Sequence, residues 1–508
     1  MIRLSLLFLL IGLGVGCSPP PPPADVLRVG VPALPASWGD PYRAEGGPPA
    51  HTWSALFDGL TRLDEVGEVQ PALAERWTSL DGKTWVFTLR DGVRFSNGAP
   101  VNASAAAATF RWLISPAGRT TIIGARMRDI AAVAAPDART LILTLQSPDP
   151  VLPRRLTSTM IVEPEAWLRL GPAGFAKAPI GSGPFRLERF DERGRRAIMT
   201  ANPQSWRAPR VAGLEVIELT DEAVRNQALI SQHIDLGRVG LDELGLLEAR
   251  GLSVVTPPSM QVMAIALVTE GRATPLDDVR VRQALNHAVD KGAISQMLLA
   301  GRGAPSGQPA SRVTAGYDPS IAPYDYDPER SIALLKAAGY GDGFDLAIEG
   351  VIGALPADAA IYQAVASYLI AIGVRAEFRP APYATMVSRN QTGRWDGIDA
   401  FANPLTAAPY NDLRKPLETY SCLKPKPFFC DPALTEALIA SSSIMDVGQR
   451  TLALQRLSRA YHDAAASIYL AEQIDVFGHT PRVKNLVIAN RVPVYELIEL
   501  KNDGPRTP

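Results

Sequence analysis

The chain has 508 residues and a mass of 54.5 kDa. It is too long to fold around a single hydrophobic core, because such cores stop growing near about 250–300 residues. Hydrophobic residues make up 46% and charged residues 20%, so disordered, collagen-like and polytopic membrane classes are excluded. The 51 Lys and Arg residues balance 52 Asp and Glu residues, which leaves no net basic field to gather nucleic acid. At about 150 residues per domain, we expect three units, or two lobes of which one is subdivided.

The N-terminus has the pattern of an export signal. Arg3 supplies a positive charge, and residues 4–16 are apolar, small or neutral, which suits a signal-peptide core and is too short for a membrane span. This run ends at Cys17 and resembles the bacterial lipoprotein signal, in which the cysteine is lipidated, although Leu13 stands one place further from it than that signal prefers. We expect residues 1–17 to be a lipoprotein signal peptide with its lipidated cysteine; an ordinary cleaved signal is the alternative.

Five prolines follow the expected lipidation site. Pro19 to Pro23 favour a polyproline II segment, which rises about 3.1 Å per residue with a solvated backbone. Residues 18–25 would then form a Pro-rich tether that holds the folded body roughly 25 Å from the membrane; a disordered leader is the alternative. These features predict a periplasmic or cell-envelope protein that is lipid-anchored after signal cleavage.

The remaining cysteines form an even pair. With Cys17 lipidated, Cys422 and Cys430 are left in an oxidising compartment, and the two prolines between them favour a bent loop. We expect a disulfide there, which would add about 2–3 kcal/mol at most. Two buried free thiols are the alternative.

The first folded residues predict a strand followed by a β-meander. Residues 27–31 alternate like a strand, and residues 71–98 carry three hairpin-type pairs, Asp-Gly, Asp-Gly and Asn-Gly. Between the first two pairs, residues 84–89 alternate between apolar and polar, which predicts a strand with one apolar face. Asn102 or Ser104 can then cap an alanine-rich helix.

The rest of the chain alternates between helical and extended patterns. Residues 181–185 are glycine-rich, but no Gly-Lys-Ser/Thr follows and a proline stands where a helix would begin, so we interpret them as the entry to a strand and not as a phosphate loop. Helices are predicted after Asp277 or Asp278, after Asp290, from Asp327 to Gly339, and over residues 361–372. Residues 374–378 then alternate as a strand. Helix followed closely by strand predicts α/β layering.

Four sequence blocks, in order along the chain, carry a family resemblance. They are PALAERW at 71–77 with DGKTW at 81–85 and LRDGVRFSNG at 89–98, GSGPF at 181–185, PLDDVRVRQAL at 275–285 with AVDK at 288–291, and YDPE at 326–329 with LL at 334–335 and AGY at 338–340. Together they resemble the signature of the bacterial extracellular solute-binding proteins, family 5, the peptide- and nickel-binding receptors of ABC importers. The blocks identify the fold, whereas the ligand has to be argued from other residues.

The resemblance implies an α/β, periplasmic-binding-protein-like two-lobe fold of the large cluster with an extra subdomain. Crossover strands would join the lobes, and hinge motion would close them around a ligand. The expected parts are residues 26–268 plus 478–508 for lobe 1, an inserted subdomain at about 50–174, residues 269–477 for lobe 2, and connecting strands at 260–269 and 468–476.

The ligand is expected between the lobes, where its polar groups need partners from both sides. The candidate ligand-binding residues are Leu34, Trp38, Gln261, Tyr383, Trp395, Asn403, Tyr410 and Asp412.

The peptide class is the default ligand of the family, but one position departs from it. In peptide binders of the family, an aspartate shortly after a Trp-Asp or Tyr-Asp strand start usually pairs with the peptide amino group. Here the strand starts at Trp395-Asp396, and the next stretch has Asn403, which offers no opposite charge; Asp399 and Asp412 on either side lie at other offsets. A turn residue before proline is the alternative for the asparagine. A non-peptide solute, such as an oligosaccharide, an opine or chelated nickel, is the alternative ligand.

Other protein classes have weaker support. The sequence has no Gly-x-Ser-x-Gly or His-Glu-x-x-His motif, which disfavours a secreted hydrolase, and its five histidines show no His-x-x-x-His spacing, so we expect neither a metal site nor a cofactor. A lipoprotein that signals or chaperones without a transporter is a further alternative. We expect a non-enzymatic, monomeric receptor that delivers its solute to an ABC permease and ATPase complex, touches the membrane through its lipid alone and binds no nucleic acid.

Overall fold

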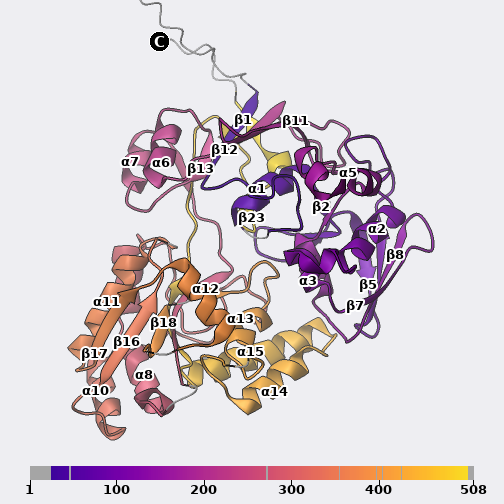
Figure 1. Ribbon diagram of the computed structural model, residues 1–508. Coiled ribbons are helices and arrows are strands. Elements are labelled where there is room, and N and C mark those ends of the chain that lie inside the picture. Colours follow the sequence, from indigo (N-terminus) through magenta and orange to yellow (C-terminus); the bar gives the residue numbers. More distant parts are fainter. Residues whose placement is uncertain are drawn as a thin grey trace, which may run out of the picture.

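The computed structural model describes residues 25–44, 47–269, 273–353, 355–395, 397–402, 404–424 and 426–501. They form two lobes, each built around a mixed β-sheet, and a smaller sheet that extends the first lobe (Figure 1). The expected signal peptide, lipidated Cys17 and nearly all of the tether lie outside the described residues. Within the described part, no helix is long and apolar enough to cross a membrane.

The first lobe is organised around seven strands in the order β10-β11-β12-β1-β13-β21-β14. Strand β1 runs parallel to both of its neighbours and is buried along nearly its whole length, as expected for a central strand covered on both faces. Strand β10 begins at Phe185, so the predicted strand entry at residues 181–185 is confirmed. The elements are β1 (Val26–Val31), β10 (Phe185–Asp191), β11 (Arg196–Ala201), β12 (Gly213–Glu218), α6 (Glu222–Ile230), β13 (Leu236–Arg238), α7 (Leu244–Ala249), β14 (Ser253–Val255) and β21 (Phe477–His479).

A buried ion network joins distant segments of this sheet. The carboxylate of Asp235 is fully buried and accepts hydrogen bonds from the backbone N–H, Nε and Nη2 of Arg28 at 2.8–2.9 Å. Nη1 of Arg482, from the C-terminal part of the chain, lies 3.1 Å from the same carboxylate. One acid therefore holds the first strand and the C-terminal segment in the same lobe.

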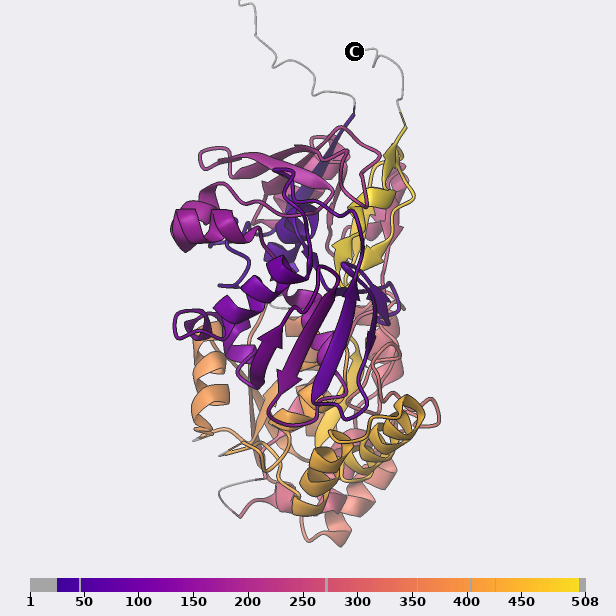
Figure 2. The same cartoon turned by 90° about the vertical axis from the view of Figure 1, so that its right-hand side faces the viewer.

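The extra part of the first lobe carries a four-stranded antiparallel sheet in the order β5-β6-β8-β7, which faces the viewer in Figure 2. Helices lie beside it and link it to the seven-stranded sheet. The elements are α1 (Gly47–Leu56), β2 (Asp58–Gly59), β3 (Thr61–Leu63), β4 (Val69–Pro71), β5 (Ala74–Thr78), β6 (Thr84–Leu89), α2 (Ala103–Leu113), α3 (Ile122–Arg126), β7 (Ile130–Ala134), β8 (Thr140–Leu145), α4 (Leu152–Arg155), β9 (Met160–Ile161) and α5 (Pro164–Lys177).

The local predictions for this region are confirmed. Gly82, Gly92 and Gly98 have φ angles of 69°, 73° and 89°, which are the left-handed values that tight turns require of glycine. Strand β6 buries alternate residues, and the side-chain oxygen of Asn102 accepts a hydrogen bond from the N–H of Ala105 at 2.9 Å to cap α2. Turn chemistry and capping therefore fix this part of the fold locally.

The second lobe contains a six-stranded sheet in the order β17-β16-β18-β15-β19, with β20 on the other side of β15. Strand β16 is parallel to β17 and β18, and β15 is antiparallel to its partners. Asp278, Asp290 and Asp327 accept a backbone N–H at 2.8 Å at the predicted helix starts. The elements are β15 (Gln261–Leu267), α8 (Val279–His287), α9 (Lys291–Ala293), α10 (Pro328–Ala337), β16 (Asp345–Gly350), α11 (Asp358–Ala371), β17 (Arg375–Pro380), α12 (Tyr383–Thr392), β18 (Ala400–Ala402), β19 (Leu405–Thr406), α13 (Arg414–Thr419), α14 (Pro432–Ser441), α15 (Val447–Asp463) and β20 (Ser467–Glu472).

The chain crosses between the lobes twice; the first crossing precedes its expected position, whereas the second, residues 473–476, lies within the expected segment. Strands β15 and β20 were expected to connect the lobes, with the first lobe ending at residue 268. The structure instead pairs both strands with each other inside the second sheet. The crossings are the short segments from β14 to β15 and from β20 to β21, and the N–H of Gln473 donates to the Gln261 carbonyl at 3.0 Å between them. An apolar strand pattern shows burial, but it does not say which sheet the strand joins.

The last described part of the chain returns to the first lobe. After the second crossing, β21 pairs with β13 and β14, and short hairpins follow: β22 (Val483–Lys484), β23 (Ile488–Ala489), β24 (Val492–Pro493) and β25 (Glu499–Leu500). In the second lobe, Cys422 and Cys430 form the expected disulfide, with their Cα atoms 4.8 Å apart. This bond closes the loop between α13 and α14.

Candidate ligand-binding site

Two predicted residues follow the first strand of the first lobe. The N–H of Leu34 donates to Oε2 of Glu218 at 3.1 Å, and the Leu34 side chain is buried. The ring of Trp38 is half-buried and packs on Phe190 with 4.8 Å between centroids, while its carbonyl accepts from Nε1 of Trp53 at 3.0 Å. Packing holds both residues in place without a ligand.

Gln261 stands where the first crossing enters the second sheet. Its side-chain Nε2 donates to Oγ1 of Thr406 at 3.0 Å, and both residues are half-buried. At the end of β20 nearby, Glu472 accepts from the backbone N–H and Nε of Arg312, each at 2.7 Å. Polar side chains from four segments therefore gather at the crossover end of the second lobe.

The predicted aromatic and amide positions of the second lobe lie partly in its core and partly outside the described residues. Trp395 packs on Phe428 with 4.2 Å between centroids and belongs to a hydrophobic core of the second lobe. Tyr383 begins α12, but its side chain lies outside the described residues, and so does Asn403. Their proposed contact with ligand stays a prediction.

A cavity of about 340 Å³ lies between the two lobes. The ends of α3 and α4 border it from the first lobe, and α13 with the segment before it borders it from the second; α3 and α13 are labelled in Figure 1. The lining residues are Arg126, Asp149, Val151 and Arg155 from the first lobe and Tyr410, Asp412, Arg414, Lys415 and Glu418 from the second. Tyr410 and Asp412 are the predicted site residues that the structure brings together.

The acidic side chains of this cavity are held by arginines. Arg450 makes two hydrogen bonds to Asp412, at 2.7 and 3.0 Å, and Asp412 is 2% exposed. On the first-lobe wall, Arg155 donates to Asp149 at 2.5 Å, and on the second-lobe wall Arg414 lies 3.0 Å from Glu418. The Asp412 carboxylate therefore lines the site but meets a ligand amine only if its arginine pair is broken.

Two cations lie against Tyr410, one from each lobe. The guanidinium carbon of Arg126 is 5.6 Å from the ring centroid, and Nζ of Lys415 is 5.3 Å from it. Burial, and after it the positive charge of Arg126, lowers the pKa of Lys415 to about 8. The side of the cavity at Tyr410 is therefore cationic and aromatic.

A second cavity of about 300 Å³ borders the first, and it shares Lys415 and Glu418 with it. Thr406, the hydrogen-bond partner of Gln261, lines this cavity. Together the two cavities therefore extend from Thr406, which binds the predicted ligand-binding residue Gln261 at the first crossing, to the predicted residue Tyr410.

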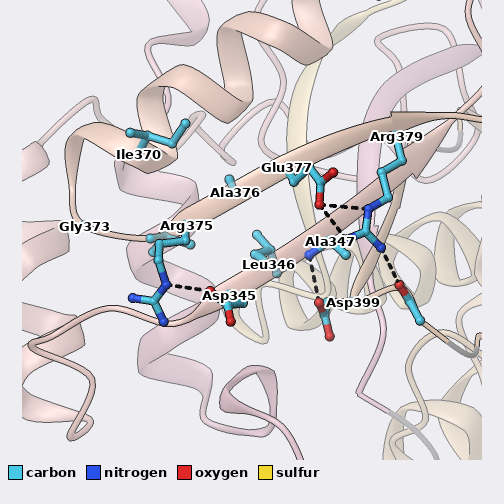
Figure 3. Close-up of a pocket in the computed structure, with 12 residues that line it drawn as sticks. Asp345, Leu346, Ala347, Ile370, Gly373, Arg375, Ala376, Glu377, Arg379 and Asp399 are labelled. Atoms are coloured by element: carbon cyan, nitrogen blue, oxygen red, sulfur yellow. Dashed lines mark hydrogen bonds and ion pairs between the residues drawn. The ribbon is translucent and has the colours of Figure 1, made fainter.

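A larger hollow of about 890 Å³ lies on strands β16 and β17 of the second lobe (Figure 3). Its charged side chains pair with each other: Arg375 with Asp345 at 2.5 Å, and Arg379 with Glu377 at 2.5 Å. Its lining residues all come from the second lobe. A ligand there would not be shared between lobes, so size alone does not make this hollow the site.

The lobes also touch at a contact that we call the clasp, formed by Gly67 in the β3–β4 turn and Asn411 of the second lobe. The side-chain Nδ2 of Asn411 donates to the Gly67 carbonyl at 2.9 Å and to the Val313 carbonyl at 2.5 Å. Arg154 of α4 also donates to the Gly67 carbonyl, at 2.8 Å. Leu63, Met260 and Ala407 form a small buried apolar cluster across the same boundary.

A buried charge cluster fixes the second crossing to the first lobe. Asp475 is 1% exposed and lies 2.9 Å from Arg238 and 2.6 Å from Arg491. His51 is close to this cluster, and burial, with a contribution from the two arginines, lowers the pKa of His51 to about 4. In the part of the chain that the structure describes, no group of three or more His, Cys, Asp or Glu side chains could hold a metal ion.

Comparison with known proteins identifies the family. The profile of the bacterial extracellular solute-binding proteins, family 5 (middle part), matches residues 68–415. The chain belongs to this family. The glutathione-binding protein GsiB of Salmonella typhi is 30% identical over 319 residues, which span 60% of each chain. Di/tripeptide-binding protein 2 of Pseudomonas aeruginosa strain UCBPP-PA14 is 27% identical over 436 residues, 80% of this chain and 81% of that protein.

Solved structures of other proteins share the fold. HbpA2 from Haemophilus parasuis superposes with a TM-score of 0.81 at 22% identity, covering 94% of this chain and 100% of that one. The α/β two-lobe fold expected from the sequence is confirmed.

Sequence reasoning missed three residues that shape the interlobe boundary. Arg126 and Lys415 are 289 positions apart, and each is one of many basic residues in the chain. Asn411 follows a proline-tyrosine pair and looks like a turn residue. The sequence signal that favoured this region was the pair of predicted ligand-binding residues on either side of Asn411, Tyr410 and Asp412.

Proposed function

We propose that this protein is the extracytoplasmic receptor of an ABC importer, which captures a short peptide or similar small solute between its lobes and delivers it to the permease. The observation that carries this proposal is the cavity at Tyr410, because both lobes line it with charged side chains. A ligand held there stabilises the arrangement in which the lobes face each other. The names of the relatives, which refer to glutathione and to di- and tripeptides, support the peptide class.

The ligand contacts proposed for this receptor come from both lobes. They are Leu34, Trp38, Gln261, Tyr383, Trp395, Asn403 and Tyr410, with Asp412 acting through the groups that it holds in place. The domain boundaries, corrected for β15, follow from the same proposal: the seven-stranded and four-stranded sheets make lobe 1, and the six-stranded sheet makes lobe 2.

A thermal-shift screen of the purified full chain tests the proposal. The probes are di- to pentapeptides, oligosaccharides, opines and chelated nickel. A ligand at 100 times its dissociation constant adds about 2.7 kcal/mol of stability, which raises the melting temperature by a few degrees. Tyr410→Ala should reduce that shift, whereas Leu80→Ala, at a fully exposed position, is the matched control. Absence of a shift with every probe contradicts the proposal.

A non-peptide solute is the second candidate. The observation that favours it is that both candidate aspartates already have partners within the protein. Asp412 is bonded to Arg450. Asp399 accepts a hydrogen bond from the backbone N–H of Ala347 at 2.8 Å, in the hollow on β16 and β17. Neither aspartate is placed to receive a peptide amine in the cavity at Tyr410. Shifts confined to opines, sugars or nickel chelates would establish this candidate in place of the first.

The remaining parts of the proposal concern attachment and mode of action. We propose that Cys17 is lipidated, that the protein has no catalytic activity, and that it acts as a monomer. Cys17→Ser should release the protein from the membrane fraction, and mass spectrometry should show any bound peptide unchanged after prolonged incubation. Release of hydrolysed peptide would contradict the non-enzymatic role.

A further inference from the structure

Met445 of the second lobe reaches across to the first lobe. It lies just before α15, is half-buried, and packs against the hydrophobic core of the first lobe. Its neighbour there is the turn between β5 and β6: a Cβ built on Gly82 would lie 2.6 Å from Sδ of Met445 and 3.2 Å from Cβ of Pro148. In Figure 2 this end of the four-stranded sheet lies next to the gold helices of the second lobe. The sulfur therefore fills space that a side chain on Gly82 would occupy.

The turn that contacts this sulfur is fixed by hydrogen bonds. Oδ1 of Asp81 accepts from the backbone N–H of Thr84 at 2.8 Å. The carbonyl of Gly82 accepts from Nε1 of Trp85 at 3.0 Å and from the backbone N–H of Asp149 at 2.9 Å. Since Asp149 lines the cavity of about 340 Å³, the turn is joined directly to the first-lobe wall of that cavity.

Met445 is joined to the second-lobe wall as well. The next residue, Asp446, caps α15 by accepting the backbone N–H of Gln449 at 2.8 Å. One turn further along this helix, Arg450 makes its two hydrogen bonds to Asp412, which lines the cavity. The contact at Met445 therefore links groups that hold the two opposing walls of the cavity.

We propose that Met445 and the Asp81-Gly82 turn form a latch that holds the lobes together around the cavity. Both sides of the latch are protein, and in the described part of the chain Met445 is not among the residues that line the cavity. The latch therefore favours the arrangement in which the lobes meet without touching the solute.

Such a latch sets the affinity of the site from outside it. The apparent Kd of a solute equals its intrinsic Kd divided by the fraction of molecules in the binding-competent arrangement. Loss of the latch lowers that fraction and so weakens binding, although every contact with the solute is retained. This inference rests on the proposed receptor function and adds a device that tunes the same site.

Distance measurements between the lobes test the latch. Spin labels are attached in a full-length Cys17→Ser chain at Leu168→Cys on α5 and Ile439→Cys on α14, two exposed positions on opposite lobes. Double electron–electron resonance without added solute should give one narrow distance distribution, and Met445→Ala should broaden it toward longer distances. Met445→Leu, which keeps an apolar side chain of similar volume, should retain it. Met297→Ala, at a methionine of the second lobe that is 80% exposed, is the control and should leave it unchanged.

The affinity for a peptide gives a second readout. In isothermal titration with Ala-Ala-Ala, Met445→Ala should raise the Kd by about 3–10-fold, as expected when a half-buried methionine is truncated. Gly82→Ala should act in the same direction, because its Cβ displaces the sulfur. Gly92→Ala is its control, since nothing lies within 4 Å of a Cβ there. Circular dichroism establishes that each variant is folded.

The outcomes separate this inference from the proposed function. Identical distance distributions for the unaltered chain and Met445→Ala, or equal shifts from Met445→Ala and Met297→Ala, overturn the latch and leave the receptor function standing. A broad distribution in the unaltered chain also overturns the latch. If Ala-Ala-Ala binds no form of the chain, this peptide is rejected as a ligand, and the distances measured without solute alone support or overturn the latch.

Discussion

Replacing Gly67 with alanine is expected to weaken the clasp between the lobes. Gly67 has a φ of 79°, and a Cβ at this position would lie 2.0 Å from Nδ2 of Asn411 and 2.9 Å from its Cγ. Asn411 is fully buried, so its amide cannot swing into solvent. The substitution therefore forces the amide to withdraw from the Gly67 and Val313 carbonyls that it binds.

The expected loss in the free energy of unfolding of Gly67→Ala has two separate contributions. Alanine at a left-handed φ costs about 1–2 kcal/mol, and two lost hydrogen bonds of about 0.5–1.5 kcal/mol each add about 1–3 kcal/mol. Gly92→Ala is the matched control, because Gly92 has a φ of 73° in the same subdomain and nothing lies within 4 Å of a Cβ built there. Gly67→Ala should therefore lower the free energy of unfolding by about 1–3 kcal/mol more than Gly92→Ala.

Urea denaturation of both variants provides the measurement, and a double-mutant cycle with Asn411→Ala assigns the cause. Once the amide is removed, the cost of Gly67→Ala should fall to that of Gly92→Ala. Equal costs for the two single glycine variants, or an undiminished cost in the Asn411→Ala background, would refute the steric argument.

Two further predictions concern buried charges. Asp235→Asn leaves Arg28 and Arg482 buried without their shared counter-charge, so the free energy of unfolding should fall by about 3–5 kcal/mol; a loss below about 1 kcal/mol in urea denaturation would contradict this account. Burial lowers the pKa of His51 from 6.5 to about 4, so the unfolded chain takes up this proton at a higher pH than the folded chain does. His51 should therefore contribute stability that is complete above pH 6.5 and falls by about 3 kcal/mol as pH drops to about 4. Denaturation from pH 7 to 4 should show a shallower loss in His51→Gln, and an unchanged slope would contradict the prediction.

Much of the fold could be predicted from local chemistry. The cap at Asn102, the turn at Gly92 and the caps at Asp278 and Asp327 each depend on neighbours within a few residues, so their sequence signals are direct. The disulfide from Cys422 to its partner is local as well.

The interlobe boundary could not be predicted in the same way. Strand β15 was assigned to the wrong lobe because its apolar residues suit a buried strand in either sheet. The pairing of Asp412 with Arg450, and the meeting of Arg126 with Lys415 at Tyr410, depend on how distant segments pack. Composition and periodicity carry no information on such contacts.

Small-angle X-ray scattering of the full chain tests the central claim, that a solute is captured between two lobes. The radius of gyration is measured without ligand and with a saturating concentration of a probe that raises the melting temperature. The account predicts a smaller radius with the probe, because a ligand shared between lobes closes them. An unchanged radius at saturation would contradict capture between the lobes.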